Sequence, residues 1–173
     1  MAEQNKDHAQ VMAPPPLIFL GYLVGALVVN WILPFPEPWT FELRIVGGLM
    51  VIAGFLLGGS AIFQMRKADT PVDPRETVTN LVTGGPYRFT RNPIYLGFFL
   101  IYVGFTFLDG TLWGLLASPF LFWTITHAVI HAEEIYLDEK FGEEYKEYRS
   151  RVRQRSEERR VGKECRSRWS PYH

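Results

Sequence analysis

The stretch that decides the fold is IVGGLMVIAGFLLGGSAIF, residues 45–63, which contains no charged residue. A helix needs about 20 predominantly apolar residues to cross the hydrocarbon core of a bilayer. The chain has 173 residues, of which 47% are hydrophobic, and its charged residues gather between stretches of this kind. Such segregation is typical of a membrane protein and argues against a water-soluble core.

Three further stretches repeat the pattern, at residues 17–33, 94–108 and 111–130. Only Asp109 and Gly110 separate the last two, which predicts an antiparallel helical hairpin. The stretch at 94–108 is short for a span, and the Pro119 within the last one is tolerated when neighbouring helices satisfy the freed backbone carbonyl. We therefore predict an all-α integral membrane fold with four transmembrane helices, at about 17–33, 45–63, 94–108 and 111–130.

Basic residues mark one side of the predicted membrane. The loop between the second and third spans and the segment after the fourth carry ten of them: Arg66, Lys67, Arg75, Arg88, Arg91, Lys140, Lys146, Arg149, Arg151 and Arg153. Because cytoplasmic loops are enriched in Lys and Arg, we expect both termini and the long loop to be cytoplasmic. We expect a multi-pass location, in a prokaryotic inner membrane.

The segment after the fourth span predicts a cytoplasmic amphipathic helix at about residues 132–152. Its apolar residues recur every three or four positions and form one stripe: Leu137, Phe141, Tyr145, Tyr148 and Val152. This helix should lie along the membrane interface or fold back over the bundle.

The C-terminal residues 155–173 have no apolar period and resemble the translation of a sequencing-library adapter. We interpret them as a non-native tail and residues 1–154 as one membrane domain. The single cysteine of the chain, Cys165, lies in the tail, so no disulfide is predicted.

The turn GGPYRFTRNPIY, residues 84–95, predicts an anion site. Asn92 can cap a helix whose first position is Pro93, and the free backbone N–H groups of that helix start carry a partial positive charge. Arg88 and Arg91 lie beside it. The alternative is that these arginines are membrane anchors next to an ordinary helix cap.

A second polar group, His131, Glu133 and Glu134, follows the fourth span. Because the last two spans form a hairpin, the glutamates should meet the arginine turn at one membrane face. Arginines and glutamates at one face suit a ligand that carries a positive and a negative charge, or one with an anionic end and ribose hydroxyls. His131 and Glu134 are candidate catalytic bases. They share a helix face with His127, but the histidines are few and we predict no metal site.

Three separated motifs carry a family resemblance: TNLVTGGPYRFTRNPIY (79–95), the Glu pair, and FGEEYKEYRSRV (141–152). Together they resemble the isoprenylcysteine carboxyl methyltransferase and phospholipid methyltransferase group of integral membrane methyltransferases. The resemblance implies that the chain binds S-adenosyl-L-methionine on its cytosolic side. It also implies a lipophilic methyl acceptor, with a carboxylate, amine or hydroxyl group, that enters from the bilayer.

Carried over position by position, the resemblance implies cofactor contacts at Thr79, Asn80, Leu81, Val82, Tyr87, Arg88, Arg91, Asn92, Pro93, Ile94, Tyr95 and Glu133. Three positions depart from the family pattern. Asn92 and Thr79 stand where members have histidine, so no titrating imidazole is present there. Val129 stands where the isoprenylcysteine enzymes are expected to have a substrate arginine, which argues against prenylcysteine as the acceptor.

Two other functions stay open. Membrane reductases of the sterol type have a similar Arg-Asn-Pro-x-Tyr run that binds NADPH, and a non-catalytic membrane protein could retain the fold. Nothing in the chain indicates nucleic-acid binding, because its basic residues lie at the membrane border.

Glycine pairs four residues apart, Gly21/Gly25 and Gly54/Gly58, predict close helix packing within the chain or in a dimer. The oligomeric state therefore stays open.

Overall fold

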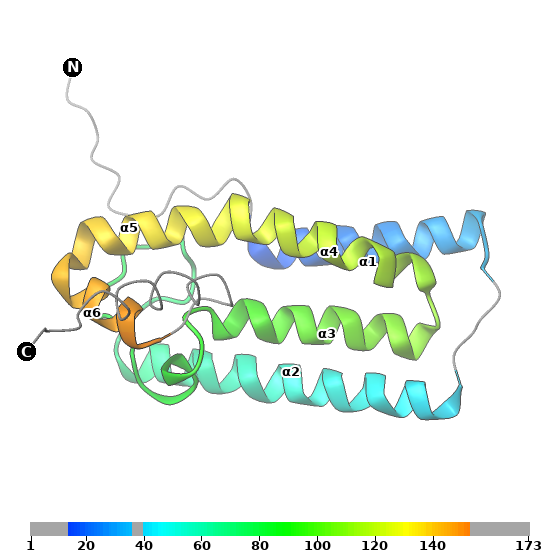
Figure 1. Cartoon of the computed structure of the whole chain (residues 1–173), viewed down its shortest axis with the longest axis horizontal. Helices are drawn as coiled ribbons and strands as arrows, with labels where there is room; N and C mark the ends of the chain where they lie inside the picture. The colour runs from blue at the N-terminus through cyan, green and yellow to red at the C-terminus, as the bar shows by residue number, and fades with distance from the viewer. Residues whose placement is uncertain (1–13, 36–39, 153–173) are drawn as a thin grey trace, which may run out of the picture.

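The computed structural model describes residues 14–35 and 40–152, and it is helical throughout its regular elements (Figure 1). The elements are α1 (Pro15–Ile32), α2 (Phe41–Lys67), the 3-10 turn η1 (Gly85–Arg88), α3 (Pro93–Asp109), α4 (Leu112–Ile125), the π-helical turn η2 (Thr126–Ile130), α5 (His131–Phe141) and α6 (Glu143–Arg151). The described residues contain no strand, so the all-α prediction is confirmed for them.

Three helices are long and apolar enough to cross a membrane: α1, α2 and the continuous helix from Leu112 to Phe141 that α4, η2 and α5 form together. The fourth, α3, is apolar but has only 17 residues. Large apolar side chains face outward, for example Phe55 and Leu56, which are 63% and 70% exposed. A surface of this kind is suited to lipid and not to water.

The four long helices pack side by side, with α3 between α2 and α4 and with α1 alongside α4 (Figure 1). Their core contains Phe19, Tyr102, Leu121 and Val129. The Tyr102 hydroxyl donates a 2.9 Å hydrogen bond to the carbonyl of Gly114, so a buried polar group of α3 is satisfied by α4. The hairpin predicted between these two helices is confirmed.

A glycine seam brings α2 and α3 together. A Cβ atom added to Gly54 would lie 2.6 Å from the carbonyl oxygen of Gly97, and one added to Gly47 would lie 2.7 Å from that of Gly104. The two backbones are therefore in contact, as small residues allow in membrane helices. The predicted packing role is confirmed for Gly54 but not for Gly21 and Gly25, whose added Cβ atoms would meet nothing within 4 Å.

The single C-terminal helix predicted at 132–152 is wrong in its boundaries. Instead, α5 continues α4 without a break, and α6 is a separate helix after Gly142. Gly142 has φ 50°, a left-handed conformation that glycine adopts at little cost, and the chain turns there. The predicted apolar stripe runs on across the turn, because Tyr145, Tyr148 and Val152 are buried.

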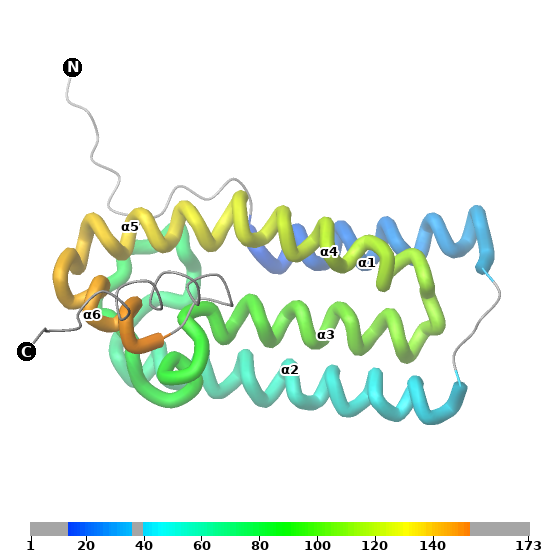
Figure 2. The backbone as a smooth tube through the Cα atoms, viewed as in Figure 1, coloured from blue at the N-terminus to red at the C-terminus, as the bar shows by residue number. Residues whose placement is uncertain are grey.

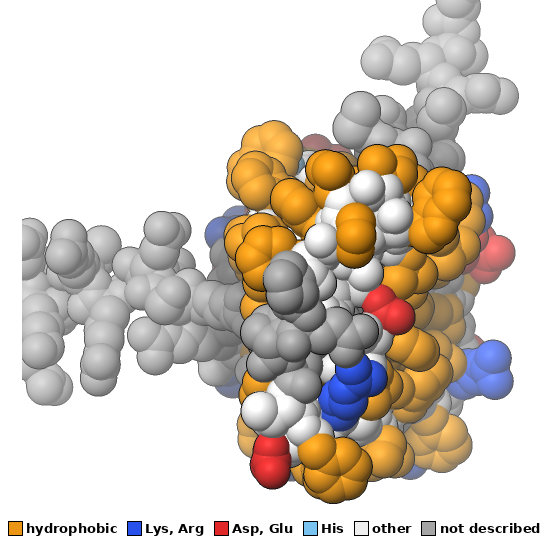
Figure 3. Space-filling view, turned by 90° about the vertical axis from the view of Figure 1, so that its right-hand side faces the viewer, with side chains coloured by type: hydrophobic (Ala, Val, Ile, Leu, Met, Phe, Trp, Pro, Cys, Tyr) orange, Lys and Arg blue, Asp and Glu red, His pale blue; other side chains and the backbone are white. Residues whose placement is uncertain are grey.

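The long loop between α2 and α3 lies at the same end of the bundle as η1, α5 and α6 (Figure 2). Figure 3 shows the opposite end, where hydrophobic side chains surround a few charged ones. The polar segments of the chain therefore converge at one end, as expected. The predicted non-native tail with Cys165, and Arg153, lie outside the described residues.

Candidate active site

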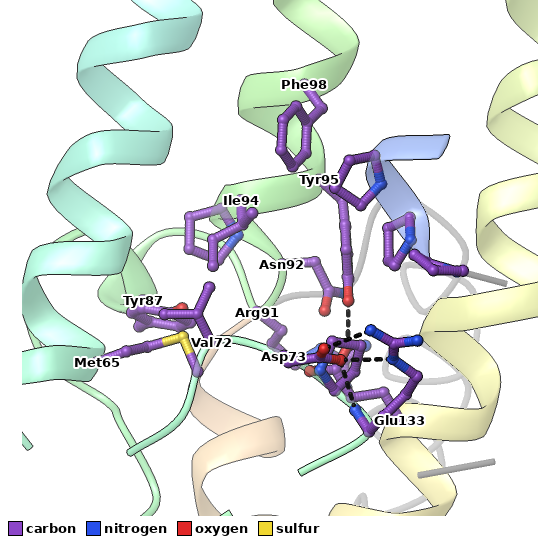
Figure 4. A pocket seen from close by; sticks show the side chains of 16 residues that line it. Met65, Val72, Asp73, Tyr87, Arg91, Asn92, Ile94, Tyr95, Phe98 and Glu133 are labelled. Atoms are coloured by element: carbon purple, nitrogen blue, oxygen red, sulfur yellow. Dashed lines mark hydrogen bonds and ion pairs between the residues drawn. The ribbon is translucent and has the colours of Figure 1, made fainter. Parts of the chain in front are cut away.

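A cavity of about 290 Å³ opens at the end of the bundle where the polar segments meet (Figure 4). Its size is at the lower end of the range typical of small-molecule sites. The cavity is lined by Pro14, Pro15, Pro16, Met65, Val72, Asp73, Pro74, Arg75, Tyr87, Arg91, Asn92, Pro93, Ile94, Tyr95, Phe98 and Glu133.

Seven of these residues were predicted from the sequence as cofactor contacts: Tyr87, Arg91, Asn92, Pro93, Ile94, Tyr95 and Glu133. They come from η1, from the segment between η1 and α3, from the start of α3 and from α5. The hairpin of α3 and α4 brings the last of these elements back to the first turn of α3. The expected meeting of the glutamate pair with the arginine turn is therefore observed.

Glu133 reaches the cavity from α5 and faces Tyr95 on the first turn of α3. The Tyr95 hydroxyl donates a 3.0 Å hydrogen bond to Oε2 of Glu133, and Figure 4 shows the Tyr95 side chain pointing toward it. The bond orients the carboxylate, which keeps further lone pairs for a ligand hydroxyl or amine.

Glu134, the next residue, points elsewhere and pairs with Arg91. The guanidinium Nη2 of Arg91 lies 3.3 Å from Oε1 of Glu134, and their side chains are 3% and 10% exposed. Two other nitrogens of Arg91, Nε and Nη1, are buried and have no hydrogen-bond partner among the described residues. A buried hydrogen-bond donor without a partner lowers the stability of the fold, and an anion that accepts hydrogen bonds from this guanidinium would remove that cost.

The start of α3 adds a partial positive charge to the same wall. Asn92 is the N-cap residue and Pro93 occupies the first turn, as predicted, but the Asn92 side chain makes no capping hydrogen bond. It lines the cavity instead. First-turn amides of a helix attract anions, so this wall and Arg91 favour the same kind of ligand.

Tyr87 also lines the cavity and is only 8% exposed. Burial, with a smaller effect of the nearby Glu133, raises its pKa above the usual range, so the phenol stays neutral. Its ring offers an aromatic surface to a ligand in the cavity.

The long loop contributes cavity residues that were not predicted from the sequence. Asp73 accepts hydrogen bonds of 2.9 and 2.6 Å from Nε and Nη2 of Arg75. The bonds from the Arg75 side chain lower the pKa of Asp73 to about 2. No local pattern distinguishes the other unpredicted lining residues from ordinary loop or span residues. They are Met65, Val72, Pro74, Phe98 and Pro14–Pro16.

The remaining predicted contacts lie outside the cavity lining. Asn80 donates a 2.7 Å hydrogen bond to the carbonyl of Ala68, and Thr79 donates to that of Asp69, so both attach the loop to the end of α2. Leu81 and Val82 pack in a second core cluster, and Arg88 is exposed. The roles of these five in cofactor binding stay predictions.

The candidate bases do not line the cavity either. His131 is exposed on α5, and Glu134 is buried against Arg91. His127 Nδ1 lies 2.9 Å from the Trp123 carbonyl on its own helix. Over residues 14–35 and 40–152, no three His, Cys, Asp or Glu side chains form a metal-binding group.

A bundle of apolar helices with a polar-lined cavity at one end is consistent with a class: multi-pass helical membrane proteins. The phospholipid methyltransferase family matches residues 43–144, and the chain belongs to this family. The resemblance inferred from the motifs is confirmed.

Curated relatives agree with this assignment. The protein-S-isoprenylcysteine O-methyltransferase of Schizosaccharomyces pombe is 38% identical over 72 residues, which are 42% of this chain and 30% of the relative. Protein-S-isoprenylcysteine O-methyltransferase B of Arabidopsis thaliana is 33% identical over 108 residues, 61% of this chain and 55% of the relative. The human enzyme of the same name is 33% identical over 113 residues, 64% of this chain and 39% of the relative.

The matched regions therefore span between about a third and just over half of the length of these relatives. No solved structure was found that matches the chain.

Proposed function

We propose that the protein transfers a methyl group from S-adenosyl-L-methionine to a lipophilic acceptor at the cytoplasmic membrane face. The observation that carries the proposal is Arg91 at the wall of the cavity, a buried guanidinium two of whose nitrogens have no hydrogen-bond partner within residues 14–35 and 40–152. The cofactor has a carboxylate that such a group binds. Family membership supports the choice of this cofactor over other anions.

The residues present fit the other parts of the cofactor. Arg91 and the first-turn amides of α3 would hold the carboxylate, and Glu133, oriented by Tyr95, would accept hydrogen bonds from the amino group or the ribose hydroxyls. Tyr87 would pack against the adenine or the sulfonium. When bound, the cofactor supplies an electrophilic methyl group. The task of the chain is then to orient the acceptor and to exclude water.

A carboxylate is the acceptor group that the cavity favours. Its attack on the methyl group releases no proton, so no base is needed, and the described residues that line the cavity include no histidine. Val129, where a substrate arginine was expected, is fully buried in the core and leaves that role open.

We propose a lipophilic carboxylate, and S-isoprenylcysteine, which the names of the relatives contain, as the first compound to assay. An amine or hydroxyl acceptor would need a base, and His131 and Glu134 are then the candidates.

The membrane arrangement that we propose has four spans, with α3 crossing despite its 17 residues because it packs along α2 over its own length. A short span is accommodated by local thinning of the bilayer. Both termini are cytoplasmic, in a prokaryotic inner membrane, residues 1–154 form the domain, and residues 155–173 are a non-native tail.

The test is isothermal titration of the full chain in mild detergent with S-adenosylhomocysteine and, in parallel, with NADPH. Binding of the first alone at micromolar concentration supports the proposal. Binding of NADPH alone would assign the cavity to a reductase, and binding of neither would favour a non-catalytic protein.

The same titration with Arg91→Gln tests the anion site. We expect affinity for S-adenosylhomocysteine to fall by about tenfold or more, since a charge-assisted hydrogen bond contributes about 1.5–3 kcal/mol. Arg66→Gln is the matched control, because Arg66 is exposed on the last turn of α2 and does not line the cavity. Equal affinities of the two variants would contradict the assignment of Arg91.

A further inference from the structure

The short helix α6 has a buried aromatic face that does not reach the cavity. Of its nine residues, Tyr145 and Tyr148 are 1% and 7% exposed. The rest of the helix is polar, with charged residues in its first and last turns. A helix of this length is not stable alone in water, so these two tyrosines hold it against the bundle.

What they pack against is the back of the cavity wall. Tyr145 and Tyr148 belong to a core cluster with Tyr87, and Met65 and Ile94 pack against the same cluster. The cavity is lined by Tyr87, Met65 and Ile94, whereas no residue of α6 lines it. The helix therefore supports the wall from behind.

One hydrogen bond connects α6 to the wall directly. The Tyr148 hydroxyl donates to the backbone carbonyl of Tyr87 at 2.8 Å, across 61 residues of sequence, and the contact is buried. Tyr87 lies in η1, a 3-10 turn of only four residues between Gly84 and the loop to α3. So short a turn does not determine its own position, and a buried tertiary bond to it has a large effect on where the Tyr87 side chain lies.

We propose that Tyr148 is a positioning residue: its hydroxyl holds η1 so that the Tyr87 side chain forms the cavity wall, and cofactor affinity depends on α6 although α6 does not touch the cofactor. The effect on cofactor affinity rests on the proposed function. The restraint of η1 by Tyr148 is independent of it, because it depends only on the hydrogen bond to the Tyr87 carbonyl.

The test compares Tyr148→Phe with Tyr145→Phe. Both variants remove one phenol oxygen from the same buried face of α6, but only Tyr148 bonds to the Tyr87 carbonyl. We expect Tyr148→Phe to weaken S-adenosylhomocysteine binding by about three- to tenfold, the effect of one buried hydrogen bond, and Tyr145→Phe to change it by less than about twofold. The KM for the lipophilic acceptor should be the same in both.

Hydrogen exchange of the η1 amides supplies a second readout that needs no ligand. The amide of Phe89, which donates to the Pro86 carbonyl at the end of η1, should exchange faster in Tyr148→Phe than in Tyr145→Phe or the wild type. This comparison remains valid if the wild type does not bind S-adenosylhomocysteine, in which case the proposed function fails and not the restraint.

Two results would overturn the inference. Equal affinities and equal exchange in the two variants would show that the bond does not position Tyr87. An equal loss of affinity in both, together with a lower melting temperature in both, would show that α6 only stabilises the bundle.

Discussion

Replacing Gly97 by alanine should separate α2 from α3 next to the cavity. An added Cβ at Gly97 would lie 2.8 Å from the carbonyl oxygen of Gly54, and 3.0 and 3.2 Å from the backbone nitrogen and Cα of Gly58. All three neighbours are backbone atoms, so no side chain can rotate away. Ordinary van der Waals contact begins at 3.4 Å, so the two helices must separate locally by about 0.6 Å to restore it.

The magnitude follows from two opposed terms. Overpacking a well-packed contact destabilises a protein by about 1–3 kcal/mol. The higher helix propensity of alanine returns up to about 1 kcal/mol. We therefore expect Gly97→Ala to lower the free energy of unfolding by about 1–2 kcal/mol, or the melting temperature by about 2–8 °C.

The shift should also reach the site. Gly97 follows Tyr95 by two residues on the same helix, so a displaced α3 changes the position of the Tyr95 hydroxyl relative to Glu133. We expect S-adenosylhomocysteine affinity to fall together with stability, because the cavity residues of α3 and α5 no longer have the same spacing.

Thermal unfolding in mild detergent, followed by intrinsic fluorescence, measures the first effect, and titration calorimetry measures the second. The control is Gly59→Ala on α2, where an added Cβ meets nothing within 4 Å. It should be as stable as the wild type or slightly more so. If Gly97→Ala equals Gly59→Ala in stability and in ligand affinity, the close approach of α2 and α3 is not as described.

Three further outcomes are expected. Tyr95→Phe removes the 3.0 Å hydrogen bond to its glutamate partner and should weaken S-adenosylhomocysteine binding by about three- to tenfold, measured by calorimetry. Glu134→Gln leaves the buried charge of Arg91 without its counterion and should lower the free energy of unfolding by about 3–5 kcal/mol, whereas Glu144→Gln, which is exposed, should have no measurable effect in the same melting experiment. Because the folded pKa of Asp73 is depressed to about 2, its contribution to stability is complete above about pH 4 and is lost as pH falls through 2. Melting curves of Asp73→Asn should therefore lack this component of acid sensitivity, and identical acid profiles of variant and wild type would contradict it.

The helical segments and one half of the candidate site were predictable from the sequence. Long apolar stretches and the Asn92-Pro93 helix start are local signals, and the short link between α3 and α4, at Gly110 and Thr111, brings Glu133 back to Tyr95. The convergence of these residues therefore required no knowledge of side-chain packing.

The contribution of the long loop was not predictable. Asp73 and Arg75 reach the cavity because the loop is attached to α2 and α5, through bonds such as that from the Val78 amide to the Tyr136 hydroxyl. These attachments depend on residues far apart in the chain. The break at Gly142 was missed for a different reason: the apolar stripe continues across it, so its periodicity conceals the turn.

By itself, the sequence determined which segments are apolar helices, where α3 starts, and that the polar residues gather at one end of the bundle. Hydropathy, helix-start residues and loop length are local properties, which is why the sequence suffices for them. Only the tertiary structure decided that Arg91 is buried with two nitrogens that find no partner in the described part of the chain, that α2 and α3 touch through glycines, and that Tyr148 bonds to the Tyr87 carbonyl behind the cavity wall. Burial and close approach are produced by contacts between distant residues, and no local pattern encodes them.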